Sequence, residues 1–159
     1  MTDPYKKENQ EIKSILFVCL GNICRSPLAE AIAKEMATKY SLTMECESAG
    51  TGSWHVGEAP CENSQIVASN NNKDISHYTA RQVTQNDFKK FDIIVGLDKS
   101  NIDNLKKMGC KDPVLLGSFG YNGEDVPDPY FFDGYEGFDK VYNMIQFCID
   151  NLFKRKILN

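Results

Sequence analysis

The chain has 159 residues, 42% of them hydrophobic and 25% charged, with a formal net charge of -4. This length suits one domain that can form a hydrophobic core without disulfides. The acidic balance, with a pI near 5.2, argues against a general nucleic-acid-binding protein, which usually has a basic face.

Residues 1–12 are predicted to form a polar tail ahead of a single domain at 13–159, and they lack the apolar stretch of a secretory signal. No apolar run approaches the roughly 20 residues that a membrane-spanning helix needs. Six cysteines occur, at positions 19, 24, 46, 61, 110 and 148. We expect reduced thiols in a cytoplasmic protein. A zinc site is not indicated, because only His55 and His77 could complete a Cys/His set.

Strands and helices are predicted to alternate along the chain. The segment 14–19 has the continuous apolar character of a buried strand. A helix is predicted over 27–39, because Leu28, Ile32 and Met36 share one face and Pro27 suits a first helical position. Further along, the patterns predict a strand at 43–48, helices at 61–70 and from a capping box at 84–87, a strand at 91–97, a helix capped at 100–103 and ended by Gly109, and a strand at 114–116.

A long loop rich in Gly, Pro and Asp is predicted at 117–137, and a final helix with an apolar stripe from Phe138 to Phe153 follows it. Loops of this length tend to be functional. Short apolar strands that alternate with helices indicate a parallel sheet covered on both faces. We therefore predict a single-domain α/β three-layer sandwich. Ligands of such sheets bind at the carboxyl ends of the strands, and the first strand ends at Cys19.

The turn after the first strand carries the chemistry. It reads CLGNICRSP from Cys19 onwards and joins a strand to a helix N-terminus, where free N–H groups and the helix dipole attract anions. Gly21 and Asn22 tolerate positive φ, which would let several amides turn inward around an anion. Arg25 adds a planar guanidinium that can hold two phosphate oxygens.

Cys19 stands at the start of this predicted anion site. Helix N-termini and neighbouring cations stabilise thiolates, so we expect Cys19 to rest as the thiolate. A thiolate that faces a bound phosphate can attack phosphorus and form a cysteinyl-phosphate intermediate. An Arg six positions after a Cys is common by chance, and the prediction depends on the strand, the Gly-Asn turn and the helix start around it. A purely structural role for these residues is the alternative.

Residues 18–30, VCLGNICRSPLAE, resemble the signature of low-molecular-weight protein tyrosine phosphatases. The resemblance covers the chain from about residue 14 to the C-terminus and includes Ser48-Ala49-Gly50-Thr51, Trp54, His77 with Ala80-Arg81-Gln82, Asp98 with Ser100-Asn101, and Asp128-Pro129-Tyr130. It implies a four-stranded parallel sheet of order 2-1-3-4 with helices on both faces. It also implies a phosphatase without metal or cofactor. Its partners would be phosphotyrosine proteins or small aryl phosphates, not nucleic acid or membrane, and it would be a monomer or weakly self-associating.

The proton donor is expected in the long loop. A phenolate leaving group needs a proton, and a positioned acid accelerates such reactions about 10²–10⁴-fold. Asp128 lies between two prolines, and the second biases its backbone toward extended conformations. On the residues alone, Asp-Pro is equally an ordinary turn dipeptide. The resemblance implies that Asp128 first donates the proton and then acts as base on the attacking water.

The resemblance assigns further roles. Phosphate binding falls to the loop residues Leu20, Gly21, Asn22, Ile23, Cys24, Arg25 and Ser26, with Trp54 and Tyr130 as walls for the substrate ring. Asn22, Ser26, Ser48 and His77 would form a hydrogen-bond network that supports the loop. On the residues alone, Trp54 and Tyr130 could be core residues, and His77 could be an ordinary buried histidine. Phe131 replaces the frequent second tyrosine of the family's acid loop, and His55 stands at a variable position.

Cys24 is expected to have a redox role, because peroxide attack on Cys19 would leave a sulfenic acid that a nearby thiol can convert to a disulfide. The expected bond is Cys19–Cys24, and the other four cysteines are assigned to packing or chance. Two other functions compete with the phosphatase. Arsenate reduction would need further cysteines close together on one mobile segment, and a phosphate-binding module would need neither Cys19 nor Asp128. The sequence leaves open whether the substrate is phosphotyrosine, phosphoarginine or a small aryl phosphate.

Overall fold

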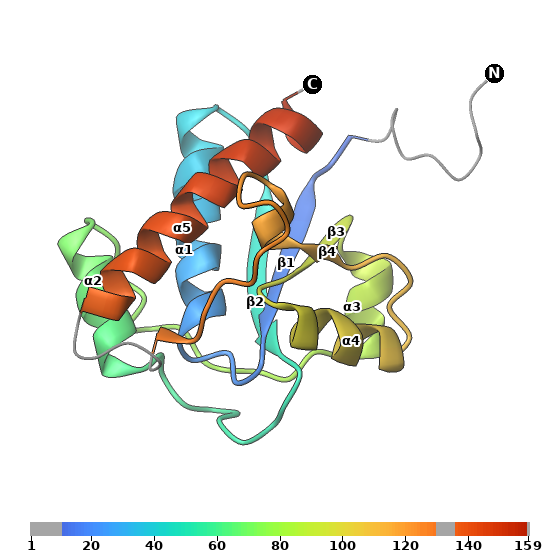
Figure 1. The fold of residues 1–159 in the computed structure, drawn as a ribbon, viewed down its shortest axis with the longest axis horizontal. Helices are drawn as coiled ribbons and strands as arrows, with labels where there is room; N and C mark the ends of the chain where they lie inside the picture. Colours follow the sequence, from blue (N-terminus) through green and yellow to red (C-terminus); the bar gives the residue numbers. More distant parts are fainter. Residues whose placement is uncertain (1–10, 130–135, 159) are drawn as a thin grey trace.

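The computed structural model describes residues 11–129 and 136–158 (Figure 1). Its centre is a four-stranded parallel sheet of order β2-β1-β3-β4. The strands are β1 (Ser14–Cys19), β2 (Glu45–Gly50), β3 (Ile93–Gly96) and β4 (Val114–Leu115). Helices cover both faces, so the predicted three-layer fold and strand order are confirmed.

Two groups of helices enclose the sheet. Helices α1 (Arg25–Lys39), α2 (Glu62–Asn70) and α5 (Glu136–Leu152) lie on one side, and α3 (Gln85–Lys90) and α4 (Lys99–Lys107) on the other (Figure 1). A short π-helical segment, η3 (Phe153–Ile157), continues α5. Among the described helices, none is long and apolar enough to cross a lipid bilayer.

Strand β1 is buried on both faces because successive side chains of a strand point to opposite sides. Ile15 and Phe17 pack in the core with α1 and α5, whereas Leu16 and Val18 belong to the second core with Phe91 and neighbouring side chains. This continuous burial explains the uninterrupted apolar run in the sequence. It also fixes the carboxyl end of β1, where Cys19 lies, between the ends of β2 and β3.

Several predicted boundaries are shifted. Strand β2 begins at Glu45 and continues to Gly50, because its pairing with β1 extends to Cys19. Helix α1 begins at Arg25, which places Pro27 in its first turn, where N–H groups have no intrahelical partner in any case. The predicted long loop contains a short 3-10 helix, η1 (Leu116–Ser118), and ends at Glu136. The capping box of Thr84 and Asp87 at α3 is confirmed.

Candidate active site

The loop between β1 and α1 lies at the carboxyl edge of the sheet. Its first residues continue to pair with the chain beyond β2, since Thr51 N donates to Cys19 O (2.9 Å) and Gly52 N to Leu20 O (2.9 Å). Asn22 has the predicted positive φ, 58°. Gly21 does not have a positive φ, contrary to expectation; its lack of a side chain instead makes room for His55, whose Cδ2 would lie 2.9 Å from a Cβ there.

The Cys19 thiol sulfur is buried among hydrogen-bond partners. Ser26 Oγ lies 2.9 Å from Cys19 Sγ, and the backbone N–H of Asn22 donates to the same sulfur (3.3 Å). Asn22 Nδ2 donates to Ser26 Oγ (2.8 Å), so that the serine proton is left to point at the sulfur. The arrangement therefore offers two donors to a Cys19 thiolate.

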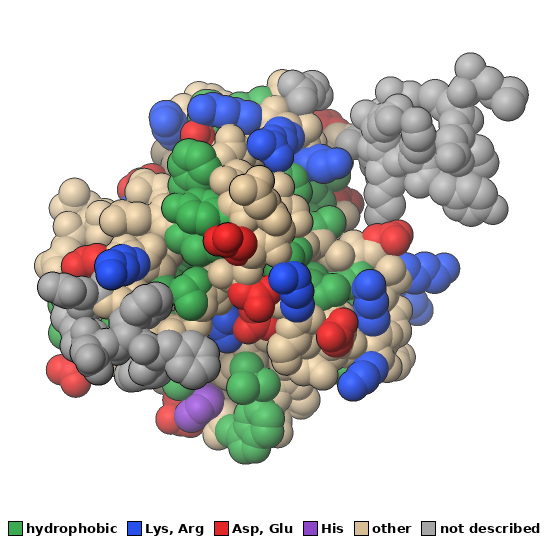
Figure 2. All heavy atoms as spheres, in the orientation of Figure 1, with side chains coloured by type: hydrophobic (Ala, Val, Ile, Leu, Met, Phe, Trp, Pro, Cys, Tyr) green, Lys and Arg blue, Asp and Glu red, His purple; other side chains and the backbone are tan. Residues whose placement is uncertain are grey.

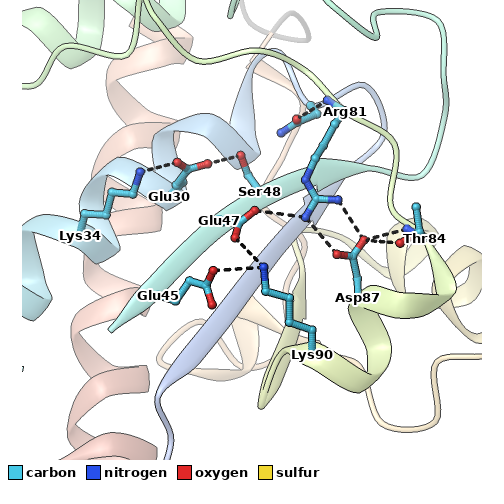
Figure 3. A network of polar contacts seen from close by, with 10 residues as sticks. Glu30, Lys34, Glu45, Glu47, Ser48, Arg81, Thr84, Asp87 and Lys90 are labelled. Carbon is cyan, nitrogen blue, oxygen red and sulfur yellow. Dashed lines mark hydrogen bonds and ion pairs between the residues drawn. The ribbon is translucent and has the colours of Figure 1, made fainter. Parts of the chain in front are cut away.

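Asn22 holds the loop to the rest of the fold. Besides its bonds to Cys19 and Ser26, its Oδ1 accepts a hydrogen bond from the backbone N–H of Arg81 (3.0 Å). Arg81 is in turn held by Asp87 and Glu47, with contacts of 3.0 and 3.4 Å (Figure 3). The loop conformation is thus connected to α3 and β2 through Arg81.

The expected network of Asn22, Ser26, Ser48 and His77 is wrong in its last two members. Ser48 Oγ donates to Glu30 Oε1 (2.7 Å), and Lys34 Nζ donates to the other Glu30 oxygen (2.6 Å; Figure 3). His77 is exposed, and its ring meets the ring of Tyr78 edge-on at 4.9 Å between centroids.

Tyr78 takes the inward place that was expected for His77. Its hydroxyl lies 3.5 Å from Lys34 Nζ, and it lines a cavity of about 170 Å³ together with Asn22, Glu30 and Ser48. Burial, followed by the charge of Glu30, raises the pKa of Tyr78. Adjacent residues in this turn face different sides, and neighbouring aromatic rings give no sequence signal for which one turns inward.

Arg25 is buried and already oriented. Its Nη1 donates to Asp98 Oδ2 (2.7 Å) and to Val126 O (2.9 Å). Burial alone would lower the pKa of Arg25, but the nearby charges of Cys19 and Asp98 outweigh it and raise that pKa. The guanidinium therefore stays charged beside Cys19.

Asp98 is the functional residue to which sequence reasoning gave no role. Its Oδ1 accepts from Asn101 N (2.7 Å) at the start of α4, which leaves Oδ2 for Arg25. The helix was expected to be capped at 100–103, yet Asp98 is its N-cap. The signal was present as an Asp three residues before an Asn, directly after a buried strand.

Asp128 lies in a segment that is fixed to the sheet edge. Val126 N donates to Leu97 O (2.9 Å), and Val126 O accepts from Arg25. Burial has the largest effect on the pKa of Arg25 and lowers it, and the charges of Cys19 and Asp98 raise it. The charge of Asp128 raises the same pKa by a smaller amount. Asp128 is half-buried two residues after this attachment of Val126. Tyr130 and Phe131 lie outside the described residues.

Exposed apolar side chains surround the loop. Trp54 is 72% exposed and Leu20 47% exposed, and Val56 is also exposed. Figure 2 shows hydrophobic side chains on the surface at the bottom of the view, where Figure 1 places the loop after β2. Trp54 is thus a surface residue, in contrast to the core position that a lone tryptophan often has.

Cys24 and Ile23 complete the loop beside the start of α2. Ile23 O accepts from Cys61 N (2.8 Å), and the Cys24 and Cys61 sulfurs lie 2.8 Å apart. Cys61 thus contacts the loop through both its backbone and its sulfur. Within residues 11–129 and 136–158, no group of three or more His, Cys, Asp or Glu side chains is arranged to hold a metal ion.

Comparison with known proteins decides the family. The model of the low molecular weight phosphotyrosine protein phosphatase family matches residues 14–158. The chain belongs to this family. A low molecular weight protein-tyrosine-phosphatase of Staphylococcus saprophyticus, PtpA, is 38% identical over 144 residues, which are 87% of this chain and 90% of that protein. The chain is accordingly a hydrolase of the low-molecular-weight protein tyrosine phosphatase type.

Solved structures agree with this membership. A protein tyrosine phosphatase of Entamoeba histolytica, crystallised with Hepes in its active site, superimposes with a TM-score of 0.83 at 34% identity and covers 90% of this chain and 96% of that one. A Drosophila arginine phosphatase, DARP, has a TM-score of 0.80 at 33% identity and covers 88% and 95%, respectively.

Proposed function

We propose that this protein hydrolyses protein phosphotyrosine and small aryl phosphates through a cysteinyl-phosphate intermediate. The observation that carries the proposal is the pair of donors on Cys19 Sγ, Ser26 Oγ at 2.9 Å and Asn22 N at 3.3 Å, beside the buried Arg25. Donors on the sulfur favour a thiolate, which is the nucleophilic form of cysteine.

In the first step, the Cys19 thiolate attacks the phosphorus of a phosphate bound by the loop amides and Arg25. The S–P bond forms as the P–O bond to the leaving group breaks, and Asp128 gives its proton to the departing phenolate. Arg25 stabilises the charge that spreads over the phosphoryl oxygens. Its attachment to Asp98 and Val126 fixes the guanidinium in place before substrate binds.

In the second step, Asp128, now a carboxylate, takes a proton from a water that attacks the cysteinyl phosphate. The S–P bond breaks, phosphate is released and Cys19 leaves as a thiolate. Ser26 stabilises that thiolate, since the hydroxyl proton is free to point at the sulfur. The same contacts therefore assist both steps.

Trp54 supports the choice of an aryl substrate. Its exposed ring lies in a loop that is tied to the anion site by the bond from Gly52 N to Leu20 O (2.9 Å). A flat aromatic surface beside an anion site favours a phosphorylated ring by stacking. Tyr130 would be the opposite wall. A cytoplasmic location and a monomeric or weakly self-associating state stay predictions.

The test is the turnover of a phosphotyrosine peptide and of para-nitrophenyl phosphate by the purified protein, with and without EDTA. We expect activity that EDTA does not reduce and that Cys19→Ser abolishes. A phosphoarginine peptide is the substrate for comparison, since one structural relative is named an arginine phosphatase. Faster hydrolysis of phosphoarginine than of phosphotyrosine would overturn the substrate assignment, and turnover by Cys19→Ser would overturn the intermediate.

A further inference from the structure

Two cysteines that the proposed mechanism does not use as thiols meet beside the anion loop. Cys24 is the N-cap residue of α1 and Cys61 is the N-cap residue of α2. Their Sγ atoms lie 2.8 Å apart, neither cysteine is in a disulfide, and both residues are half-buried. A disulfide bond is about 2.03–2.05 Å long, so the sulfurs need to approach each other by less than about 1 Å.

The contact is held by the backbone as well as by the side chains. Cys61 N donates to Ile23 O (2.8 Å), and Ser64 Oγ donates to Cys24 O (3.1 Å). Cys61 Sγ donates to Ser64 Oγ (3.2 Å), which leaves the Cys24 thiol to donate to Cys61 Sγ. These bonds close a ring between the loop and α2 and keep the two sulfurs facing each other.

We propose that Cys24 and Cys61 form a redox pair that accepts oxidation from Cys19, so that mild peroxide treatment ends in a Cys24–Cys61 disulfide with Cys19 reduced. The linkage between Cys24 and Cys61 is independent of the phosphatase reaction. That this disulfide returns Cys19 to its active, reduced form rests on the proposed function of Cys19 as the nucleophile.

The steps balance with hydrogen peroxide as the oxidant. The Cys19 thiolate takes one peroxide oxygen to become sulfenic acid and releases hydroxide. The Cys24 thiol attacks this sulfur, which forms the Cys19–Cys24 disulfide and releases water. Cys61 then attacks the Cys24 sulfur, the Cys19–Cys24 bond breaks, and Cys19 leaves as a thiolate while the Cys61 proton neutralises the hydroxide. In total, one peroxide and two thiols give one disulfide and two waters.

The direction of the last step follows from the environment of each sulfur. The Cys61 sulfur lies against Cys24, so Cys24 is the sulfur attacked. The leaving thiolate is Cys19, which Ser26 and the Asn22 amide stabilise, and a stabilised thiolate leaves faster. A disulfide whose reduced form is stabilised in this way is also a strong oxidant. Transfer of the bond to Cys61 is therefore favourable.

Cys24 itself is a poor leaving group. Its hydrogen bond with Cys61, burial, and the nearby charges of Cys61, Cys19 and Asp128 all raise the pKa of the Cys24 thiol. A thiol with a raised pKa departs slowly from a disulfide. Attack by Cys19 on the Cys61 sulfur would have to expel Cys24, so this route back to an oxidised Cys19 is slow.

The experiment treats the full, reduced protein with one equivalent of hydrogen peroxide, blocks free thiols by alkylation, and maps disulfides by peptide mass spectrometry. The variants are Cys61→Ser and, as a matched control, Cys110→Ser, which removes a buried cysteine of the second core. Serine is a favoured N-cap residue, so Cys61→Ser keeps the start of α2. Activity on para-nitrophenyl phosphate is measured before and after addition of a dithiol.

We expect a Cys24–Cys61 peptide in the wild type and in Cys110→Ser, with most activity kept before the dithiol is added. Cys61→Ser should instead contain Cys19–Cys24 and lose at least about tenfold more activity until the dithiol restores it. A final Cys19–Cys24 bond in the wild type, or equal losses in Cys61→Ser and wild type, would overturn the proposal. If the reduced protein proves inactive, the proposed function fails, but the peptide map still decides whether Cys24 pairs with Cys61.

Discussion

At the scale of single residues, the contact of Ser26 with Cys19 distinguishes the proposed nucleophile from the packed cysteines. Cys46 and Cys148 are also buried, and burial raises their pKa values to about 12 and about 11, respectively. Both are therefore thiols at neutral pH. Hydrogen-bond partners face the Cys19 sulfur, Ser26 Oγ at 2.9 Å and Asn22 N at 3.3 Å. The sequence alone placed Cys19 at a strand end, but the orientation of the Ser26 hydroxyl depends on Asn22 and required the structure.

We predict that Ser26→Ala slows hydrolysis of the intermediate more than its formation. The variant loses the donor that stabilises the Cys19 thiolate as it leaves phosphorus. A hydrogen bond to a charged group contributes about 1.5–3 kcal/mol, which corresponds to a rate loss of about 10–100-fold. Stopped-flow measurements with para-nitrophenyl phosphate should show a burst of product followed by slow turnover. A variant with wild-type steady-state rates would refute this role.

Asp128→Ala is predicted to affect substrates according to their leaving group. Without the acid, a poor leaving group departs unprotonated, and the loss should be about 10²-fold or more. A good leaving group such as a strongly acidic phenol needs little help and should lose much less. The measurement is the rate of a series of aryl phosphates with phenols of increasing acidity. Asp125→Ala is the matched control, and equal losses for all substrates would mean that another group donates the proton.

At the scale of elements, the apolar patterns predicted the strands and helix faces that are buried in the core. The run at 14–19 became β1, and the stripe from Phe138 to Phe153 is the buried face of α5 and its π-helical continuation. Boundaries that depend on partners in space were missed. The end of β2 follows its pairing with β1, and the start of α4 follows the double role of Asp98 with Asn101 and Arg25. Contacts across 73 residues, such as Arg25 with Asp98, leave no local pattern.

Asp87 gives a test of how α3 is attached to the loop. Burial would raise the pKa of Asp87, but the hydrogen bonds from Arg81 and Thr84 outweigh it and lower that pKa. A carboxyl with a lowered folded-state pKa stabilises the fold above its unfolded pKa, near 3.9, and this stability is lost as the pH falls through the folded value.

We therefore predict that Asp87→Asn lowers the free energy of unfolding at pH 7 by about 1–3 kcal/mol, because the charge-assisted bonds to Arg81 are lost. The difference from wild type should shrink as the pH falls below about 4. Urea unfolding at several pH values measures it. Asp103→Asn, on the surface of α4, is the control. A difference that is independent of pH would mean that the Asp87 charge does not contribute.

At the scale of the whole molecule, the site is assembled from four parts of the chain around the carboxyl edge of the sheet. The segment from the end of β1 to the start of α1 supplies Cys19 and Arg25, and the N-cap of α4 supplies Asp98. The turn before α3 supplies Arg81, and the segment after η1 carries Val126 and Asp128. Figure 3 shows the Arg81 guanidinium in contact with Glu47 of β2 and Asp87 of α3. Family resemblance implied most of these residues, but the choice of Tyr78 over His77 and the meeting of Cys24 with Cys61 came from the fold.

Trapping the intermediate is the most direct test that phosphate passes through Cys19. The protein is mixed with para-nitrophenyl phosphate, quenched in acid within milliseconds and mapped by peptide mass spectrometry. We expect a phosphate on the peptide that contains Cys19, present during turnover, more abundant in Ser26→Ala and absent from Cys19→Ser. Phosphate on another residue, or turnover with no phosphorylated peptide in either the wild type or Ser26→Ala, would contradict it.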